Sequence, residues 1–275
     1  MKKRNTTVIL ILIPIIMVVI ILFSCANNKV EFVAHRGASH DAPENTLAAF
    51  DLAWQQGADA IEGDFYLTND NAIVCIHDKT TKRLANSDLV VAESSLEQLK
   101  ELDVGSWKDP KWRGEKIPTI KEVLATVPNG KKILIEIKCG PEIVPELKKS
   151  LSVSELSSDQ TVVISFDQEV IQQVKRQIPQ IKAFWLTGFR KNEDTRQWTP
   201  TLDTIHEILS DIKADGLDCR AGEVVTSSFV KSLKDAHLEM HVWTVDDPDE
   251  AQRLKDIGVQ SITTNRPGWL KEQLQ

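Results

Sequence analysis

Short apolar stretches alternate with amphipathic stretches along most of the chain. The apolar stretches are bounded by polar residues or glycine, which is typical of buried strands. Eight of them are expected to form strands: Val30–His35, Ala60–Tyr66, Lys132–Lys138, Thr161–Ser165, Ile181–Leu186, Ala214–Leu217, Leu238–Val245 and Ser261–Thr264. The intervening stretches, such as Gln168–Gln177 and Pro248–Ile257, carry apolar residues at helical spacing. This alternation predicts an α/β fold, a (β/α)8 TIM barrel built from parallel βα units.

The alternation is interrupted once, after the second predicted strand. An extended run, Ala72–Ile76, leads into residues 79–118, where one short helix is expected at Ser94–Asp103 and the remainder is irregular. We interpret 79–118 as a small insertion after the second βα region, folded against the barrel mouth. Long irregular segments of compact domains often have a functional role, and covering apolar surface is the alternative.

The first residues follow a different pattern. Three basic residues precede an uncharged apolar run, Val8–Phe23, which is followed by Ser24-Cys25. This resembles the lipobox of bacterial lipoproteins, so we expect residues 1–25 to be a lipoprotein-type signal peptide, with lipid on Cys25. Residues 26–29 are then a tether, and residues 30–275 the barrel domain. An uncleaved signal anchor and ordinary cleavage are the alternatives.

A lipoprotein signal, an uncleaved anchor and an ordinary signal peptide would each export the folded domain across the cytoplasmic membrane. A lipid at Cys25 would hold it at the outer face of that membrane or at the outer membrane. The formal net charge is −7, and it becomes −10 when Lys2, Lys3 and Arg4 are removed. So negative a protein is not expected to bind nucleic acid non-specifically, and no protein partner is indicated. An anionic substrate would have to be attracted by a local cationic cluster or by a metal ion.

Three carboxylates are expected near the mouth of the predicted barrel. Glu62 and Asp64 share one face of the second strand, and Glu136 belongs to the strand that starts at Lys132. Three carboxylates directed to one place repel each other unless a cation compensates them. A set of oxygen ligands favours one hard divalent cation, Mg²⁺ or Ca²⁺. The alternative is a purely structural network of ion pairs with Arg36 and Lys138.

Two histidines, His35 and His77, are expected at the ends of different strands in the same region. Displacement at a phosphodiester needs one group that takes a proton and one that gives a proton, and two histidines suit both tasks near neutral pH. Arg36 and Lys138 would then hold the phosphoryl oxygens. Trp243 is either a wall of the substrate site or a core residue. The histidine two residues before it is expected to pack inside the barrel.

Six motifs together resemble the glycerophosphodiester phosphodiesterase family. In chain order they are His35-Arg36-Gly37, Pro43-Glu44-Asn45-Thr46, Glu62-x-Asp64, His77-Asp78, Ile135-Glu136-Ile137-Lys138 and Trp243-Thr244-Val245. The similarity extends over nearly the whole chain after the N-terminal segment and includes the insertion. One difference lies at Thr264-Asn265-Arg266-Pro267, where the family commonly has Thr-Asp-x-Pro. We expect this difference to affect a hydrogen bond behind the site or the substrate rim.

The resemblance implies a TIM barrel in which His35 and His77 are the acid/base pair. It implies that Glu62, Asp64 and Glu136 hold a divalent metal, and that Arg36 and Lys138 contact phosphate. The implied reaction is hydrolysis of a glycerophosphodiester to glycerol 3-phosphate and an alcohol, through a cyclic phosphate. Two alternatives stay open: a lysophospholipase D that acts on acylated lysophospholipids, and a catalytically silent lipoprotein that binds glycerophosphodiesters. An apolar groove leading out of the mouth would favour the first of these alternatives.

Overall fold

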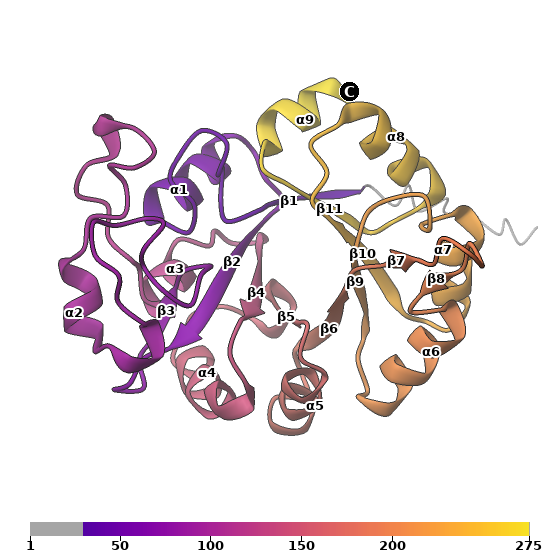
Figure 1. Ribbon diagram of the computed structural model, residues 1–275, viewed down its shortest axis with the longest axis horizontal. Coiled ribbons are helices and arrows are strands. Elements are labelled where there is room, and N and C mark those ends of the chain that lie inside the picture. Colours follow the sequence, from indigo (N-terminus) through magenta and orange to yellow (C-terminus); the bar gives the residue numbers. More distant parts are fainter. Residues whose placement is uncertain (1–29, 275) are drawn as a thin grey trace, which may run out of the picture.

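The computed structural model describes residues 30–274, which form a closed parallel barrel (Figure 1). The first strand pairs with both the last strand and the second one, so the sheet closes on itself. The barrel strands, in chain order, are β1 (Glu31–Ala34), β2 (Ala60–Leu67), β4 (Lys132–Ile137), β5 (Thr161–Ser165), β6 (Lys182–Thr187), β9 (Gly216–Arg220), β10 (Glu239–Trp243) and β11 (Ser261–Thr264). This confirms the (β/α)8 TIM-barrel prediction.

A helix follows every barrel strand and covers the outside of the sheet (Figure 1). These helices are α1 (Leu47–Gln55), α3 (Ile120–Ala125), α4 (Val144–Ser152), α5 (Gln168–Gln177), α6 (Leu202–Asp211), α7 (Ser227–Asp235), α8 (Pro248–Ile257) and α9 (Pro267–Gln273). Thr46 caps α1 by accepting a hydrogen bond from the N–H of Ala49.

None of the helices within residues 30–274 is long and apolar enough to cross a membrane. The predicted signal peptide, the tether and Cys25 lie outside the described residues.

Strand periodicity divides the apolar side chains into two layers. Side chains that face outward pack against the helices in one large cluster. The lower interior of the barrel is filled by a second apolar cluster: Val33, Ala60, Leu134, Val162, Ile164, Phe184 and Leu186. His241 belongs to this interior, as predicted, because its ring stacks on Phe184 with 4.3 Å between the centroids. Towards the carboxyl ends of the strands the inward positions become polar, and the site lies there.

The insertion has a small core of its own. It is preceded by β3 (Ile73–Cys75), which pairs antiparallel with β2, and it contains α2 (Leu96–Glu101) and the short 3-10 turns Val91–Glu93 and Pro110–Trp112. Its apolar residues pack with those of β2 and of the β3 segment in one cluster: Tyr66, Val74, Ile76, Leu84, Val91, Leu99, Val104 and Ile117. It therefore covers apolar surface, and it also reaches the site through Arg83.

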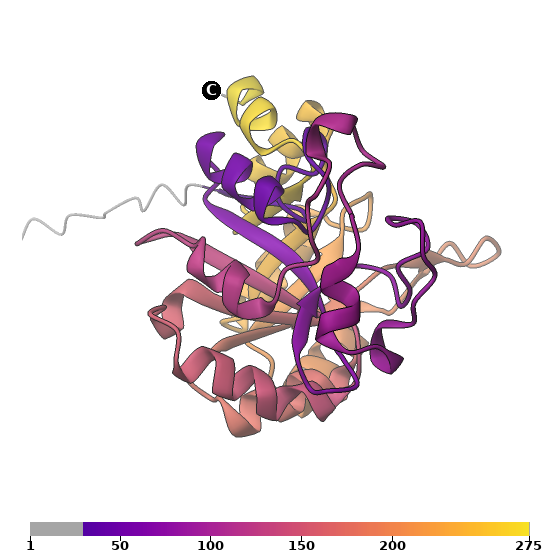
Figure 2. The same cartoon turned by 90° about the vertical axis from the view of Figure 1, so that its left-hand side faces the viewer.

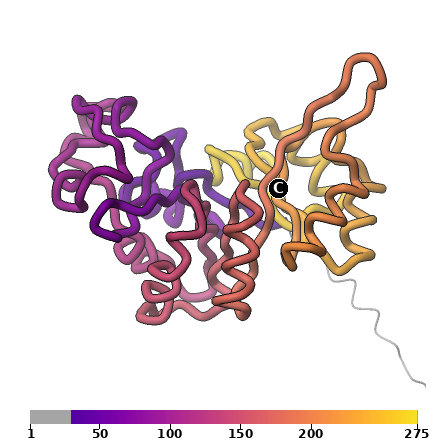
Figure 3. The backbone as a smooth tube through the Cα atoms, turned by 60° about the horizontal axis from the view of Figure 1, so that its bottom comes forward, coloured from indigo at the N-terminus to yellow at the C-terminus, as the bar shows by residue number. Residues whose placement is uncertain are grey.

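A short hairpin that the sequence pattern does not predict also lies at the mouth. It consists of β7 (Arg190–Lys191) and β8 (Trp198–Thr199). Figure 2 shows this hairpin and part of the insertion projecting from the end of the barrel towards which β2 runs. The tube in Figure 3 shows the hairpin extending well beyond the rest of the chain. The remaining 3-10 turns are Pro141–Ile143 and Ser158–Gln160.

Strand β9 is displaced from its predicted position. We predicted a strand at Ala214–Leu217, but β9 spans Gly216–Arg220. Asp218 lay outside the predicted strand, whereas it occupies an inward position of β9 that pairs with Leu186 of β6 and His241 of β10. A fully buried aspartate inside a strand breaks the apolar pattern from which strands are predicted.

The turn after β1 depends on Gly37. Its φ is +78°, and a Cβ at this position would lie 2.6–2.7 Å from the backbone and Cβ of Ala49 in α1. Gly37→Ala is therefore expected to lower the free energy of unfolding by about 2–4 kcal/mol, through the left-handed backbone and the clash together. Denaturant unfolding followed by circular dichroism measures this change. Gly57→Ala is a control, because its φ is also positive and a Cβ there would meet open space; an equal loss there would assign the cost to φ alone.

Candidate active site

A cavity of about 190 Å³ lies at the carboxyl ends of the barrel strands. Its lining includes seven of the predicted site residues: His35, Arg36, Glu62, His77, Glu136, Lys138 and Trp243. Asp64, the eighth, is fully buried and forms ion pairs with Arg36 and Lys138 beside the cavity. Residues that are up to 208 positions apart in the chain thus meet at one place, because most of them sit at or just after strand ends and Glu62 faces the same cavity from within β2.

The three carboxylates form one cluster. Asp64 of β2 pairs in register with Glu136 of β4, and Glu62 lies two residues earlier on the same face of β2. One oxygen from each of the three side chains lies within 4.8 Å of the others. Burial, together with the charges of Asp64 and Glu136, raises the pKa of Glu62 well above its usual range. Burial and the charge of Asp64 likewise raise the pKa of Glu136 to about 7.

This donor set fits a cation. Glu62 Oε1 and Asp64 Oδ1 are buried and accept no hydrogen bond from the described residues. Buried oxygens of this kind are costly unless something compensates them. A divalent cation coordinated by the three carboxylates would use these oxygens and relieve the repulsion that raises the pKa values. Glu62, Asp64 and Glu136 are therefore able to hold a hard metal ion.

Arg36 and Lys138 flank the carboxylate cluster. Arg36 Nε lies 3.2 Å from Asp64 Oδ2, and Lys138 Nζ lies 2.6 Å from Glu136 Oε1 and 3.4 Å from Asp64 Oδ1. Burial opposes ionisation of Asp64, but Arg36 and Lys138 outweigh it and lower its pKa. The structural network that we considered as an alternative thus exists in part. It does not include Glu62, whose carboxylate, among residues 30–274, accepts a hydrogen bond only from the backbone N–H of Arg36.

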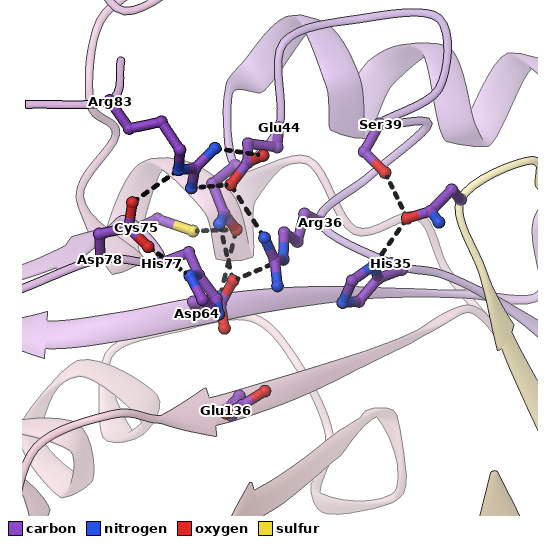
Figure 4. Close-up of polar contacts among 12 residues, drawn as sticks. His35, Arg36, Ser39, Glu44, Asp64, Cys75, His77, Asp78, Arg83 and Glu136 are labelled. Atoms are coloured by element: carbon purple, nitrogen blue, oxygen red, sulfur yellow. Dashed lines mark hydrogen bonds and ion pairs between the residues drawn. The ribbon is translucent and has the colours of Figure 1, made fainter. Parts of the chain in front are cut away.

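A chain of hydrogen bonds fixes the orientation of His35, and Figure 4 shows the contact at the His35 ring where it begins. Its Nδ1 lies 2.7 Å from Asn265 Oδ1, and Asn265 Nδ2 donates to Asp246 Oδ2 at 2.6 Å. Because the carboxylate can only accept, the amide NH₂ must face Asp246 and the amide oxygen must face His35. His35 therefore carries its proton on Nδ1 and has Nε2 free. Burial and the charge of Arg36 lower the pKa of His35, which keeps its ring neutral.

Substitution of Asn265 should change both the rate and its pH dependence. Asn265→Leu removes the acceptor for Nδ1, so we expect kcat to fall roughly 10²-fold with little change in KM. Asn265→Asp places a negative charge beside His35, which raises its pKa and moves the acidic limb of kcat/KM to higher pH. Initial rates between pH 5 and 9 measure both effects. If both variants kept the wild-type pH profile, Asn265 would have no positioning role.

His77 is oriented from the opposite side of the site. Its Nδ1 lies 2.6 Å from Asp78 Oδ1, and Arg83 Nε donates to Asp78 Oδ2 at 2.6 Å. Burial opposes ionisation of Asp78, but hydrogen bonds from Arg83 and His77 lower its pKa. Arg83 also forms a paired contact with Glu44, which in turn binds Arg36. The network in Figure 4 thus joins the insertion to the first βα turn.

Trp243 lines the cavity, and its indole N–H donates to the carbonyl oxygen of Asp218 at 3.3 Å. Its ring meets Phe166 edge to face, so it forms a wall of the cavity. Sequence reasoning assigned no role to three residues of this region: Asp78, Asp218 and Asn265. Asp78 belonged to the His77-Asp78 motif and Asn265 to the difference from the family's usual Thr-Asp-x-Pro pattern, whereas Asp218 gave no signal. The structure confirms that Asn265 provides a hydrogen bond behind the site.

Comparison with known proteins agrees with this geometry. The model of the glycerophosphoryl diester phosphodiesterase family matches residues 35–269. A glycerophosphodiester phosphodiesterase of Caldanaerobacter subterraneus subsp. tengcongensis is 32% identical over 247 residues, which cover 87% of this chain and 95% of that protein. A glycerophosphodiester phosphodiesterase of Bacillus subtilis is 28% identical over 258 residues, covering 87% and 85%.

Solved structures of phosphodiesterases are similar to this chain as well. A phosphodiesterase of Oleispira antarctica, in complex with the product sn-glycerol-3-phosphate, has a TM-score of 0.79 at 26% identity, covering 89% of this chain and 96% of that one. A glycerophosphodiester phosphodiesterase of Agrobacterium tumefaciens has a TM-score of 0.73 at 26% identity, covering 89% and 100%. The family model spans the barrel from His35 to Trp269, and with it the whole cavity. The chain belongs to the glycerophosphoryl diester phosphodiesterase family.

Proposed function

We propose that the chain hydrolyses glycerophosphodiesters to glycerol 3-phosphate and an alcohol by proton transfer between His35, His77 and the substrate. The observation that carries this proposal is the cavity itself. Two histidines, two cationic side chains and a cluster of carboxylates line or adjoin a space of about 190 Å³. A protein that only binds the diester needs no pair of oriented proton-transfer groups. This argues against the silent lipoprotein.

Glu62, Asp64 and Glu136 are the residues that we propose to hold one divalent cation, Mg²⁺ or Ca²⁺. When bound, such a cation supplies positive charge to the phosphoryl oxygens and favours ionisation of a nearby hydroxyl. Arg36 and Lys138, both partly exposed to the cavity, would contact the same phosphoryl group. Local positive charge thus compensates the net negative charge of the whole chain.

The environments of the two histidines support a division of their roles. His35 is neutral, and its free Nε2 can take the proton of the glycerol hydroxyl next to the phosphate. That oxygen bonds to phosphorus while the bond from phosphorus to the alcohol oxygen breaks, and the product is a cyclic phosphate. His77 Nδ1 contacts the Asp78 carboxylate, which orients the ring so that Nε2 can give a proton to the leaving alcohol. Water then opens the ring, with the two proton transfers reversed.

A second candidate function is supported by a groove beside the mouth. This groove, of about 500 Å³, shares Glu136, Lys138 and Phe166 with the cavity. Its other walls are largely apolar, and Val90 and Phe166 are exposed there to 39% and 49%. An apolar groove that continues a phosphodiester site could receive the acyl chain of a lysophospholipid. Lysophospholipase D activity is therefore the alternative to be tested.

One assay compares the two functions. The full chain is incubated with glycerophosphocholine or lysophosphatidylcholine, below the micellar concentration of the latter, and choline release is measured. We expect kcat/KM to be at least 10²-fold higher for glycerophosphocholine, because the cavity is small and presents charged and hydrogen-bonding groups that suit a small polyol phosphate. A preference for lysophosphatidylcholine would favour the second function. No release from either, by protein shown to be folded, would favour the silent binder.

For the N-terminal segment, which lies outside the described residues, we propose export and lipidation at Cys25. The support is the sequence pattern alone: basic residues, the apolar run Val8–Phe23 and Ser24-Cys25. Growth of a bacterium that expresses the chain with an alkyne fatty acid should label the wild type and leave Cys25→Ser unlabelled. Equal labelling of both proteins would contradict lipidation at this cysteine.

A further inference from the structure

The cavity contains two polar atoms that the proton-transfer scheme does not use. Asp218 Oδ1 and Thr263 Oγ1 are buried, and neither has a hydrogen-bond partner among the described residues. The two side chains are 1% and 2% exposed, yet both line the same cavity as His35 and Trp243. They are thus buried polar groups directed into a site and not into the protein core.

Their surroundings make these groups costly to the fold. Asp218 pairs in register with Leu186, and Thr263 pairs with Val33, both members of the apolar interior cluster. Ile164 and Trp243 complete this part of the cavity wall. An unpaired polar atom in such surroundings costs about 1–3 kcal/mol, and an apolar residue of similar size would avoid that cost. Stability therefore does not explain the two residues, whereas a ligand with hydrogen-bonding groups does.

Their chemistry suits an uncharged hydroxyl. Thr263 Oγ1 can donate one hydrogen bond and accept others. Burial, with a contribution from the charge of Glu136, raises the pKa of Asp218 well above its usual range, which favours the protonated carboxyl, a group that can both donate and accept. A neutral pair of this kind complements an alcohol better than it complements a phosphate or a quaternary ammonium group.

Their position relates them to the glycerol end of the diester. Thr263 belongs to β11, whose pairing with β1 brings it beside Val33, two residues before His35. In the proposed reaction His35 is the base that acts on the glycerol hydroxyl next to the phosphate, so the glycerol end lies on this side.

We propose that Asp218 and Thr263 form a subsite that binds the primary hydroxyl of the substrate's glycerol end, with Trp243 as its apolar wall. This inference rests on the proposed function, and it identifies the residues that recognise the glycerol end of the substrate. A lysophospholipid carries an acyl ester in place of this hydroxyl, so it offers no hydroxyl donor to the pair. The subsite thus selects deacylated glycerophosphodiesters.

Calorimetry with the full chain tests the subsite without depending on turnover. The ligands, in the presence of Mg²⁺ or Ca²⁺, are sn-glycerol 3-phosphate and propane-1,2-diol 1-phosphate of the same configuration, which lacks the primary hydroxyl. We expect wild type to bind glycerol 3-phosphate roughly 10- to 100-fold more tightly. Asp218→Leu and the near-isosteric Thr263→Val should each raise the Kd of glycerol 3-phosphate roughly 10-fold. The Kd of the deoxy ligand should change less than about 3-fold in both variants.

Thr187→Val is the matched control. Thr187 is a buried threonine at the end of β6 that does not line the cavity, and its hydroxyl is bonded to Gly188 O. This variant should bind both ligands like wild type. The subsite would be overturned if the Asp218 and Thr263 variants bound both ligands more weakly by the same factor, or if wild type bound the two ligands with equal affinity. Weaker binding of choline in Asp218→Leu would also overturn it, since that would assign the site to the leaving group.

The same proteins separate this inference from the proposed function. If wild type discriminates between the two ligands in calorimetry but releases no choline from glycerophosphocholine, the subsite stands and the proposed reaction fails. If it releases choline but the Asp218 and Thr263 variants show no selective loss, the reaction stands and the subsite fails.

Discussion

Replacement of His35 or His77 by glutamine is expected to lower kcat for glycerophosphocholine by roughly 10²–10⁴, the usual effect of losing a general base or acid. Both rings already have their Nδ1 atoms engaged, by Asn265 and Asp78, which leaves Nε2 of each ring for the substrate. Neither side chain contributes to the apolar clusters, so both variants should remain folded. Steady-state kinetics with circular dichroism on the same samples measures the two effects.

The leaving group distinguishes the two roles. A glycerol phosphodiester of p-nitrophenol needs little protonation of its leaving oxygen, so His77→Gln should regain most of its activity on this substrate and His35→Gln should not. The control is His40→Gln, because His40 is exposed and pairs only with Asp41; it should stay within about twofold of wild type. Recovery of both variants, or of His35→Gln alone, would contradict the assignment of base and acid.

Replacement of Glu62 by glutamine should abolish the response to the divalent cation and lower kcat by roughly 10²–10⁴. The structure also predicts that the same substitution changes the free energy of unfolding in opposite directions without and with cation. Without cation, the variant should be more stable than wild type, because one of three mutually repelling buried carboxylates is gone. With cation at roughly 100 to 1,000 times its Kd, wild type should gain about 3–4 kcal/mol and the variant little.

The stability of the metal-free protein should fall as the pH rises. The pKa of Glu136 is raised to about 7, so the folded protein keeps this proton over a range in which the unfolded chain has lost it. Metal-free wild type should therefore lose stability as the pH rises through about 7, and added Mg²⁺ or Ca²⁺ should raise Tm more at pH 8 than at pH 6. Glu31→Gln is the control, since Glu31 pairs with Lys132 at the other end of the barrel. An equal Tm response in wild type and Glu62→Gln would contradict a cation at this cluster.

Strand periodicity carries most of the information about this fold. The strands Thr161–Ser165 and Ser261–Thr264 and the helices Gln168–Gln177 and Pro248–Ile257 were predicted with the bounds that the structure shows. These segments are regular because their apolar residues recur at the period of a single element. The β7–β8 hairpin could not be predicted in this way, since each of its strands has two residues and buries little apolar surface.

For the site, the sequence predicts which residues converge but not what holds them in place. His35 and Glu136 could be found because each lies at or next to a strand end, and in a parallel barrel all strand ends meet; Glu62 could be found because it shares a strand face with Asp64. The contact between His35 and Asn265 depends on closure of the barrel between β1 and β11, which join residues 230 positions apart. Asp218 was missed because its inward direction follows from register with β6 and β10. Such contacts are properties of tertiary pairing, and a single sequence does not contain them.

Cation-dependent cleavage between phosphorus and the alcohol oxygen is the step on which the proposed function depends. Phosphorus NMR of glycerophosphocholine turnover by the full chain tests it most directly, first with EDTA and then with Mg²⁺ or Ca²⁺ restored. We expect no reaction in EDTA, and with cation restored a transient cyclic phosphate followed by glycerol 3-phosphate. Turnover that is unchanged by EDTA, or release of phosphocholine in place of glycerol 3-phosphate, would contradict the proposed site.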